Sequence, residues 1–290
     1  MAKGRELKGR IKSVENTRKI TRTMEMVATS KMKRAADRVS AARPYALALG
    51  EVLSHVYTPE LAEQFPLLRR PAQIRRAALV VLTANRGLCG AFNTNLLRES
   101  RARLAEWEGQ GVSVELHVVG RKGIGFYKYL GRTLSSARAD IGDRPSSADA
   151  ASLIDELMAR YAAGEIDAVF ITYAKYKSAL STPPATEQVL PVVAPGSTGG
   201  NTVARDFILA PSATEILEAL LPLYVRNTVY RALVETAAGE QGARRTAMKN
   251  ATDNATEMLQ LLKRTYNSAR QAQITQEIAE IVGGASALQG

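Results

Sequence analysis

The sequence has little cysteine and histidine, few aromatic residues and no long apolar run. Its one cysteine, Cys89, leaves no internal disulfide framework and favours a reducing compartment. One cysteine and two histidines make a zinc site or a histidine-dependent catalytic triad implausible. The longest apolar runs, such as residues 77–82, hold six residues, whereas a transmembrane helix needs about 20. We therefore expect no disulfide scaffold, no metal or other cofactor and no membrane-spanning helix.

The N-terminal segment is strongly basic and lacks the apolar stretch of a signal peptide. Met-Ala-Lys-Gly-Arg-Glu leads directly into charged sequence, so the protein is expected to stay in the compartment where it is made. The net charge of +11 is unevenly distributed, because residues 1–43 carry 13 Lys or Arg against 4 Asp or Glu, whereas residues 213–290 carry 8 of each. Such a segment is either a solvated helix face or a contact surface for an acidic protein, anionic headgroups or nucleic acid.

The end of the sequence predicts a single helix of about 75 residues, which would be on the order of 110 Å long. Ser212-Ala-Thr-Glu215 has the pattern of a capping box that begins the helix, and Gly283-Gly284 is expected to stop it. Pro222 predicts a bend rather than an end, because the periodic pattern continues beyond it. Alanine and polar residues hold many places of the 3.5-residue seam, which includes Leu223, Val234, Met248, Ala255, Met258, Leu262 and Ala269. A helix with so narrow an apolar stripe needs a partner helix or an enclosing sleeve.

The start of the sequence predicts a second long helix, which ends at Thr58-Pro59. Ile20, Met24 and Val27 offer a neighbouring stripe to which its seam could drift; the main seam includes Leu7, Ile11, Val14, Thr21, Ala28, Met32, Ala35, Val39, Leu49, Leu53 and Val56. The two helices can pair with each other as an antiparallel coiled coil, and the longer C-terminal helix should then project alone in its last turns. The alternatives are that each helix packs on the middle of the chain or pairs with its copy in a dimer.

The middle of the sequence alternates strand and helix patterns. Strands are expected at residues 77–83, 114–119 and 168–173, with weaker candidates at 186–193 and 207–209; helices are expected through residue 107, after Gly125 and at 148–163. This alternation predicts a Rossmann-like open α/β sheet with helices on its faces. The expected fold class is α/β, with an N-terminal shaft helix at 1–58, a central α/β domain at 74–210 and a C-terminal shaft helix at 212–287.

Two glycine-rich turns invite a nucleotide-binding interpretation that their spacing does not favour. The turn at residues 85–93 lacks the spacing of a phosphate-cradling loop, and residues 120–125 read Gly-x-x-Gly-x-Gly rather than Gly-x-Gly-x-x-Gly. Tight turns between strand and helix are the simpler interpretation of both. Cys89 lies beside the first turn and is either a low-pKa thiol at a helix N-terminus or a packed structural residue, and the lack of a neighbouring His or Cys favours the second.

Both ends of the sequence resemble one known family. The run Ile-Lys-Ser-Val-Glu-Asn-Thr-Arg-Lys-Ile-Thr-Arg-Thr-Met-Glu-Met-Val-Ala-Thr-Ser-Lys-Met, at residues 11–32, resembles the N-terminal helix of the gamma subunit of F-type ATP synthase. At residues 274–287, Ile-Thr-Gln-Glu-Ile-Ala-Glu-Ile-Val-Gly-Gly-Ala-Ser-Ala is similar to the family's C-terminal signature. The sequence departs from the usual central turn at Asn85, Ala91 and Phe92. The absence of a mitochondrial presequence favours a bacterial protein, expected at the cytoplasmic face of the plasma membrane as a peripheral subunit.

The resemblance implies a rotor without an active site of its own. Its paired helices would form a shaft inside three alpha and three beta subunits, with the α/β domain beside the epsilon subunit and the membrane c-ring. Contacts with the alpha and beta subunits are implied for Met24, Arg244, Arg270, Gln271, Thr275 and Glu277. An apolar bearing suits Ile274, Ile278, Ile281 and Val282 near the C-terminal tip, although an ordinary amphipathic helix end would show the same pattern. Charge alone suggests Lys33 and Arg34 as a foot on the c-ring.

Two other functional classes remain as alternatives to the rotor. The first is a nucleotide-dependent α/β enzyme with a coiled-coil oligomerisation arm, which would bind nucleotide through residues 74–210. The second is a basic coiled-coil protein that binds nucleic acid in a salt-dependent manner. Few aromatic residues lie among the basic residues of the first helix, so stacking on single strands has little support. We therefore expect no nucleic-acid partner.

Overall fold

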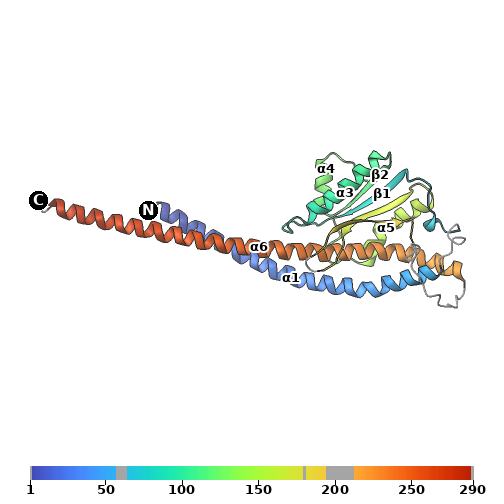
Figure 1. Ribbon diagram of the computed structural model, residues 1–290, viewed down its shortest axis with the longest axis horizontal. Helices are drawn as coiled ribbons and strands as arrows, with labels where there is room; N and C mark the ends of the chain where they lie inside the picture. The colour runs from blue at the N-terminus through green and yellow to red at the C-terminus, as the bar shows by residue number, and fades with distance from the viewer. Residues whose placement is uncertain (1, 57–63, 179–180, 194–211, 289–290) are drawn as a thin grey trace. The chain divides into compact units, whose positions relative to one another are not determined.

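A computed structural model describes residues 2–56, 64–178, 181–193 and 212–288 of the chain (Figure 1). Its two long helices are α1 (Ala2–Val56) and α6 (Ala213–Leu288). Between them lie a short 3-10 helix (Pro66–Leu68), the strands β1 (Arg76–Leu82), β2 (Ser113–Val119), β3 (Ser136–Arg138), β4 (Ala168–Ala174) and β5 (Pro184–Leu190), and the helices α3 (Phe92–Gly109), α4 (Arg121–Tyr129) and α5 (Ser147–Ala162). The expected α/β fold with a long helix at each end is therefore confirmed.

The chain forms two compact units, which are described separately. The helical unit combines Met1–Ala28 with Arg245–Gly290, and the sheet unit comprises Thr29–Arg244. Each long helix contributes one part to each unit.

The sheet unit is built on five strands in the order β3-β2-β1-β4-β5. The first four strands are parallel, and β5 is antiparallel to β4. In the register of the central strands, Leu79 lies between Leu116 of β2 and Phe170 of β4. This order is that of a doubly wound α/β sheet, as the alternating pattern of the sequence predicted.

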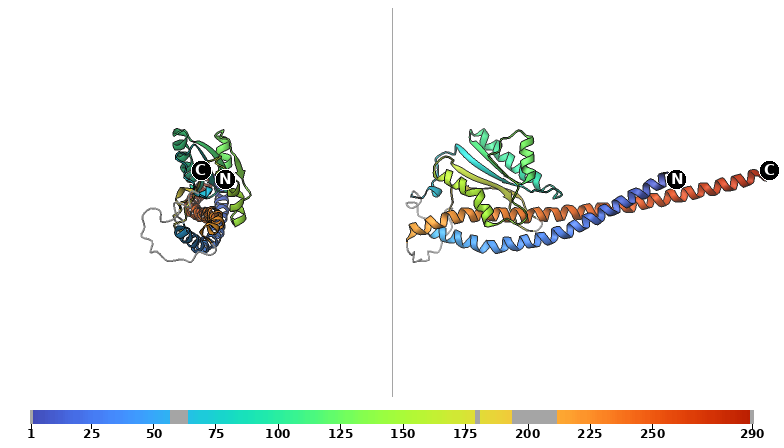
Figure 2. Two further views of the ribbon diagram at one scale, coloured as in Figure 1. Left: turned by 90° about the vertical axis from the view of Figure 1, so that its right-hand side faces the viewer. Right: turned by 180° about the vertical axis from the view of Figure 1, so that it is seen from behind.

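Strand β1 is buried on both faces, which explains why it reads as a continuous apolar run. Leu79 and Val81 pack with Leu97 of α3 and Tyr127 of α4 on one face. On the other face, the intervening residues of the strand pack with helices α5 and α6 and with the end of α1. These residues are Ala78, Val80 and Leu82. Figure 2 shows the two helical layers from further sides.

The long helices pair in an antiparallel manner within each unit. In the sheet unit Ala35 and Val39 pack with Val234 and Ala238, whereas Leu53 belongs to the same core cluster as Leu217 and Leu221. In the helical unit the Thr252 hydroxyl donates to the Thr21 hydroxyl at 2.8 Å, and Lys263 pairs with Glu15 at 3.3 Å. Residue numbers therefore rise along one helix as they fall along the other, which is the arrangement of an antiparallel pair. The predicted coiled coil within the chain is confirmed.

The seam predicted for α1 is correct, and two of the three residues of the alternative stripe are exposed. Every described side chain of the main seam is buried or half-buried, whereas Ile20 is 60% exposed and Val27 is also exposed. The seam predicted for α6 is buried or half-buried from residue 227 to residue 255, but it is wrong at Leu223 and at Met258, which are exposed, while the adjacent Leu259 is buried. Along α6 in the helical unit, the buried positions are Met248, Thr252, Ala255 and Leu259, and half-buried residues continue this side of the helix at Leu262, Tyr266, Ala269 and Gln273. Because Met258 and Leu259 are both apolar, the sequence alone could not decide which of the two is buried.

Other boundaries also differ from expectation. Helix α6 runs through Gly283-Gly284 to Leu288, because two glycines at about 1 kcal/mol each do not stop a helix that is already propagating. It also runs through Pro222, which does not end it. Strand β5 ends at Leu190 rather than residue 193, since Pro191 has no amide hydrogen to continue the ladder. Strand β3 was not predicted because three residues show no periodicity, and the candidate strand at 207–209 lies outside the described residues.

Candidate functional site: the helix pair and its anchorage

Helix α6 fills the crevice in which open α/β sheets bind their ligands. That crevice lies at the carboxyl ends of the strands where the strand order reverses, which is between β1 and β4 here. At the end of β4, the amide of Ala174 donates to Thr236 Oγ1 at 3.3 Å, and just beyond the strand the amide of Tyr176 donates to Glu235 Oε2 at 2.8 Å. The sheet therefore holds a helix of its own chain where related folds hold a small molecule.

The approach of α6 to the sheet is close because small residues line the contact. A Cβ added to Gly239 would lie 3.2 Å from the Cβ atoms of Ala174 and Thr182 and 3.3 Å from the ring of Phe92. All residues from 232 to 242 are buried, including Glu235 and Glu240. A helix buried on all sides is packed in a core, so this part of α6 is fixed.

One hydrogen bond and one ion pair join the two long helices to loops at the carboxyl edge of the sheet. The guanidinium of Arg244 donates to Glu240 Oε1 at 2.6 Å and to the carbonyl of Gly87, after β1, at 3.2 Å. Lys31 of α1 pairs with Asp143, after β3, at 2.5 Å. Burial raises the pKa of Glu240, and the charge of Arg244 opposes this rise.

A second set of charges fastens α6 to β5 and α5. Glu187 of β5 pairs with Lys175 at 2.7 Å and with Arg231 of α6 at 3.4 Å. Arg226 makes a two-point contact with Asp155 of α5, at 2.8 and 2.9 Å. The pKa of Glu235 is raised by burial, against the opposing effects of the Tyr176 amide and Arg231. Helix α6 is thus bonded to strands, loops and a helix of the sheet unit.

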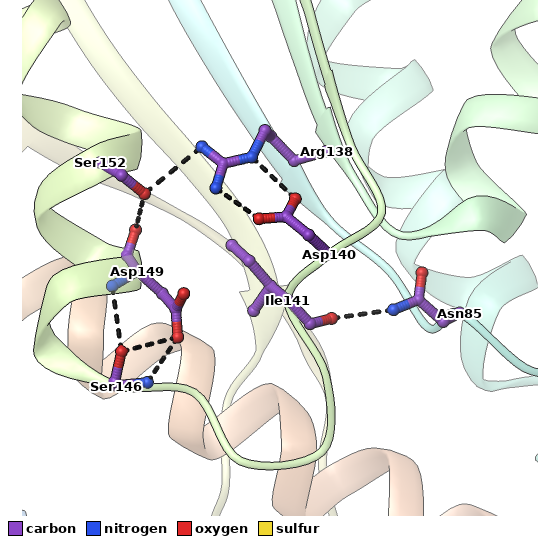
Figure 3. Close-up of polar contacts among 7 residues, drawn as sticks. All are labelled: Asn85, Arg138, Asp140, Ile141, Ser146, Asp149 and Ser152. Carbon is purple, nitrogen blue, oxygen red and sulfur yellow. Dashed lines mark hydrogen bonds and ion pairs between the residues drawn. The ribbon is translucent and has the colours of Figure 1, made fainter.

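The loop between β3 and α5 is itself rigidly bonded (Figure 3). Arg138 makes a two-point contact with Asp140, at 2.8 and 2.6 Å, which lowers the pKa of Asp140 to about 2. Ser146 and Asp149 form a capping box at the start of α5. Asn85 donates from Nδ2 to the carbonyl of Ile141 at 2.8 Å and accepts from the amide of Arg121 at 3.0 Å. An asparagine can do both, whereas an ionised aspartate can only accept.

The glycine-rich turn at residues 120–125 has no free amide for a phosphate. Its first four amides donate to protein atoms: Gly120 to Arg138 O, Arg121 to Asn85 Oδ1, Lys122 to Ala84 O and Gly123 to Thr83 Oγ1. Gly120 has φ of +99°, and an added Cβ at Gly120 or Gly123 would collide with Thr83. These two glycines therefore serve a tight turn and close packing.

Cys89 in the first glycine-rich turn is a packed residue. It is buried, and burial raises the pKa of its thiol, which disfavours the reactive thiolate. Asn93 Nδ2 donates to its sulfur at 3.2 Å and Asn93 Oδ1 accepts from the amide of Ala84 at 2.9 Å. Both turns are thus held by bonds within the domain.

The predicted contact residues fall in different places. Arg270, Gln271, Thr275 and Glu277 are exposed on α6 in the helical unit, together with the predicted bearing residues Ile274, Ile278, Ile281 and Val282. All residues from 274 to 283 are exposed, as expected for turns without a partner helix. Met24 is half-buried and lies within one turn of Thr21, which meets Thr252. Met24 therefore lies near the level of Thr252, more than a dozen residues before Arg270 on α6.

Arg244, Lys33 and Arg34 belong to the sheet unit. Arg244 is 8% exposed, and its guanidinium is engaged by Glu240 and Gly87. Lys33 and Arg34 are exposed beside Lys31, and Arg34 donates to the Ser30 hydroxyl at 3.2 Å. Sequence reasoning missed the anchoring residues Glu235, Thr236, Gly239 and Glu240. The run of small residues Ala237-Ala238-Gly239 with Gly242 was the signal that could have revealed close packing there.

The fold and the anchorage define a class of protein: an α/β domain that grips a long helix and presents a coiled coil. The family model described as ATP synthase matches residues 3–288. The chain is 78% identical to the ATP synthase gamma chain of Gemmatimonas aurantiaca, with 100% of both chains covered. It is 44% identical to that of Leptospira biflexa, with 99% of this chain and 100% of the relative covered. The chain belongs to the ATP synthase gamma chain family.

Solved structures show the same fold. The central stalk of the mitochondrial ATP synthase of Tetrahymena thermophila, solved with its c-ring, matches with a TM-score of 0.62 at 26% identity, covering 80% of this chain and 99% of that chain. The rotor of the mitochondrial ATP synthase of Euglena gracilis matches with a TM-score of 0.68 at 23% identity, covering 94% of this chain and 99% of that chain. Among the described residues, no helix is both long and apolar enough to cross a bilayer.

Proposed function

We propose that this chain is the central-stalk rotor of a rotary ATP synthase and that it carries no active site of its own. The observation that carries the proposal is the anchorage of α6: residues 232–242 are fixed in the sheet unit, while residues 274–283 of the same helix are exposed. A helix that is packed in a domain along one segment and exposed along another can transmit torque from the domain to proteins that surround the exposed segment. Family membership supports the same role.

The mechanism is conformational. A single shaft in a ring of three alpha and three beta subunits breaks the equivalence of the three catalytic sites, because it presents a different side to each. Only a difference in contact free energy can shift one subunit between conformations. Rotation then carries this bias from site to site, so that ion flow through the c-ring drives the formation of ATP from ADP and phosphate.

The side chains proposed to touch the alpha and beta subunits are Met24, Arg244, Arg270, Gln271, Thr275 and Glu277. Ile274, Ile278, Ile281 and Val282 are proposed as the bearing, since exposed aliphatic side chains lack directional bonds that would hold one angle. We propose that Arg244 also has an indirect role. Because its guanidinium bonds to the Gly87 carbonyl and to Glu240, loss of these bonds would loosen the loop after β1.

The partners proposed at the other end of the rotor are the c-ring and the epsilon subunit. We propose that the chain is peripheral, attached through the c-ring to the cytoplasmic face of the bacterial plasma membrane. Functionally it divides into the shaft helices at 1–58 and 212–287 and a central domain at 74–210. Charge alone motivates Lys33 and Arg34 as the c-ring foot, and retention of the c-ring by the doubly charge-reversed chain would contradict that assignment.

The test is the composition of the complex that purifies with a tag on this chain. The proposal predicts one copy with three alpha and three beta subunits and ATP hydrolysis by the same sample. A lone chain or a homodimer under mild conditions would contradict it. Tight nucleotide binding by the chain alone would instead favour an α/β enzyme with an oligomerisation arm.

A further inference from the structure

The outer surface of α3 and α4 carries a groove that the rotor role does not use. Its hollow, of about 470 Å³, is lined by Thr94, Leu97, Arg98, Arg101, Ala102, Ala105 and Phe126. In Figure 1 both helices lie on the face of the sheet opposite α6. The floor is apolar, because Leu97 is buried, Phe126 is half-buried and the two alanines add only methyl groups.

The rim of the groove is positively charged and lacks counter-ions. The guanidinium carbon of Arg101 lies 6.0 Å from the centre of the Phe126 ring. Among the described residues, neither Arg98 nor Arg101 has an ion-pair partner, and the same holds for Lys122, one helical turn before Phe126. Each carboxylate of α3 is already paired: Glu99 and Glu106 with Arg103, and Glu108 with Arg132. The groove therefore offers unbalanced positive charge.

Exposed apolar side chains continue the groove beyond Phe126. Tyr129, three residues further along α4, is 88% exposed, and Leu130 is also exposed. An apolar floor with a polar rim and adjoining exposed large side chains is typical of an interaction surface. Two neighbouring helices form a channel suited to a third helix, whose apolar face would lie on the floor.

We propose that the α3/α4 groove docks an acidic, amphipathic helix of another polypeptide. Its apolar side chains, spaced three and four residues apart, pack on Leu97, Ala102 and Phe126. Its carboxylates pair with Arg98 and Arg101 at the rim. A nucleic acid fits this surface less well, because its bases need aromatic stacking platforms and the groove has only the half-buried Phe126.

The test uses a photo-crosslinking amino acid in place of Ala102, an exposed floor residue, in the full chain within cells that assemble the complex. The expected adduct is a peptide with an excess of Asp and Glu and with apolar residues at helical spacing, identified by mass spectrometry. In R98E/R101E its yield should fall by about tenfold or more, because charge reversal converts attraction into repulsion. The milder R98Q/R101Q should lower it in the same direction.

The matched control is R103E/R132E, which makes the same change in net charge at two ion-paired arginines outside the groove. It should change the yield by less than about twofold, and all variants should retain ATP hydrolysis by the complex. An adduct with lipid, nucleic acid or a basic segment, no protein adduct, or an equal loss in the control would overturn the proposal. The outcome does not depend on the rotor role.

Discussion

Arg244 and Glu240, one turn apart on α6, form a buried ion pair with Nη2 2.6 Å from Oε1. The same guanidinium holds the carbonyl of Gly87 at 3.2 Å, so the pair connects α6 to the loop after β1. A buried pair is costly to break because the remaining charge loses its partner. This contact is thus a point at which the grip on α6 can be weakened without touching the exposed tip.

Replacing Arg244 with Gln should lower the free energy of unfolding by about 3 kcal/mol, since Glu240 would stay buried without its counter-charge. Urea unfolding of the full chain measures the change. Arg103→Gln is the control, because it disturbs only partly exposed ion pairs worth up to about 1 kcal/mol each. Equal effects of the two substitutions would show that the Arg244 pair does not fasten α6.

Glu235 should make stability depend on pH in a defined direction. Burial raises its pKa in the folded chain above the ordinary value of 4.5. Between the unfolded and folded pKa values the folded state binds more protons, so the free energy of unfolding decreases as pH rises through this window. Glu235→Gln retains an acceptor for the Tyr176 amide but does not titrate.

The variant should therefore show a weaker loss of stability than the wild type as pH rises above 4.5. Urea unfolding at a series of pH values up to 8 measures the difference between the two chains. A difference that stays constant over the series, or that changes in the opposite sense, would contradict the assigned shift.

Gly239→Leu should displace α6 from the sheet, because Ala174, Thr182 and Phe92 already lie at contact distance from an added Cβ. Overpacking of this kind costs about 1–3 kcal/mol, and we expect a matching fall in the urea midpoint. Gly283→Leu is the control on the same helix, since nothing lies within 4 Å of its added Cβ. Similar midpoints for the two variants would mean that α6 does not pack closely at Gly239.

Met24→Lys tests the proposed contact between α1 and the catalytic subunits. It adds a charge at a half-buried position near the Thr21–Thr252 contact, so it should lower the protons pumped per ATP hydrolysed more than it lowers assembly. Proton pumping and ATP turnover are measured on the same membrane vesicles. A normal number of protons pumped per ATP in this variant would contradict the proposed contact between Met24 and the catalytic subunits.

The sequence was most informative where local patterns decide the structure. The 3.5-residue repeat from Leu7 to Val56 identified the buried seam of α1, and the run at residues 77–82 identified a strand covered on both faces. It was less informative where two apolar neighbours compete, as at Met258 and Leu259, since only the partner helix selects the register. Strand β3 depends on pairing with β2 rather than on its own residues.

The anchorage could not be read from the sequence, because its bonds join residues far apart. Glu235 reaches the amide of Tyr176, and Arg244 reaches the carbonyl of Gly87. A glutamate in a long helix ordinarily indicates a solvated face, so its burial became visible only with the sheet in place. The exposure of Ile274 and Ile278, in contrast, was expected from the sequence, because the C-terminal helix is longer than the N-terminal helix and its last turns lack a partner.

We expect the sheet unit and the anchored helix to turn together while ATP is hydrolysed. The most direct measurement attaches a bead to a cysteine introduced at the exposed Ala137 of the full chain, in a complex immobilised through its beta subunits. The bead should rotate in one direction with pauses at three evenly spaced angles, because the surrounding ring is threefold. A bead that stays still while the complex hydrolyses ATP would contradict this expectation.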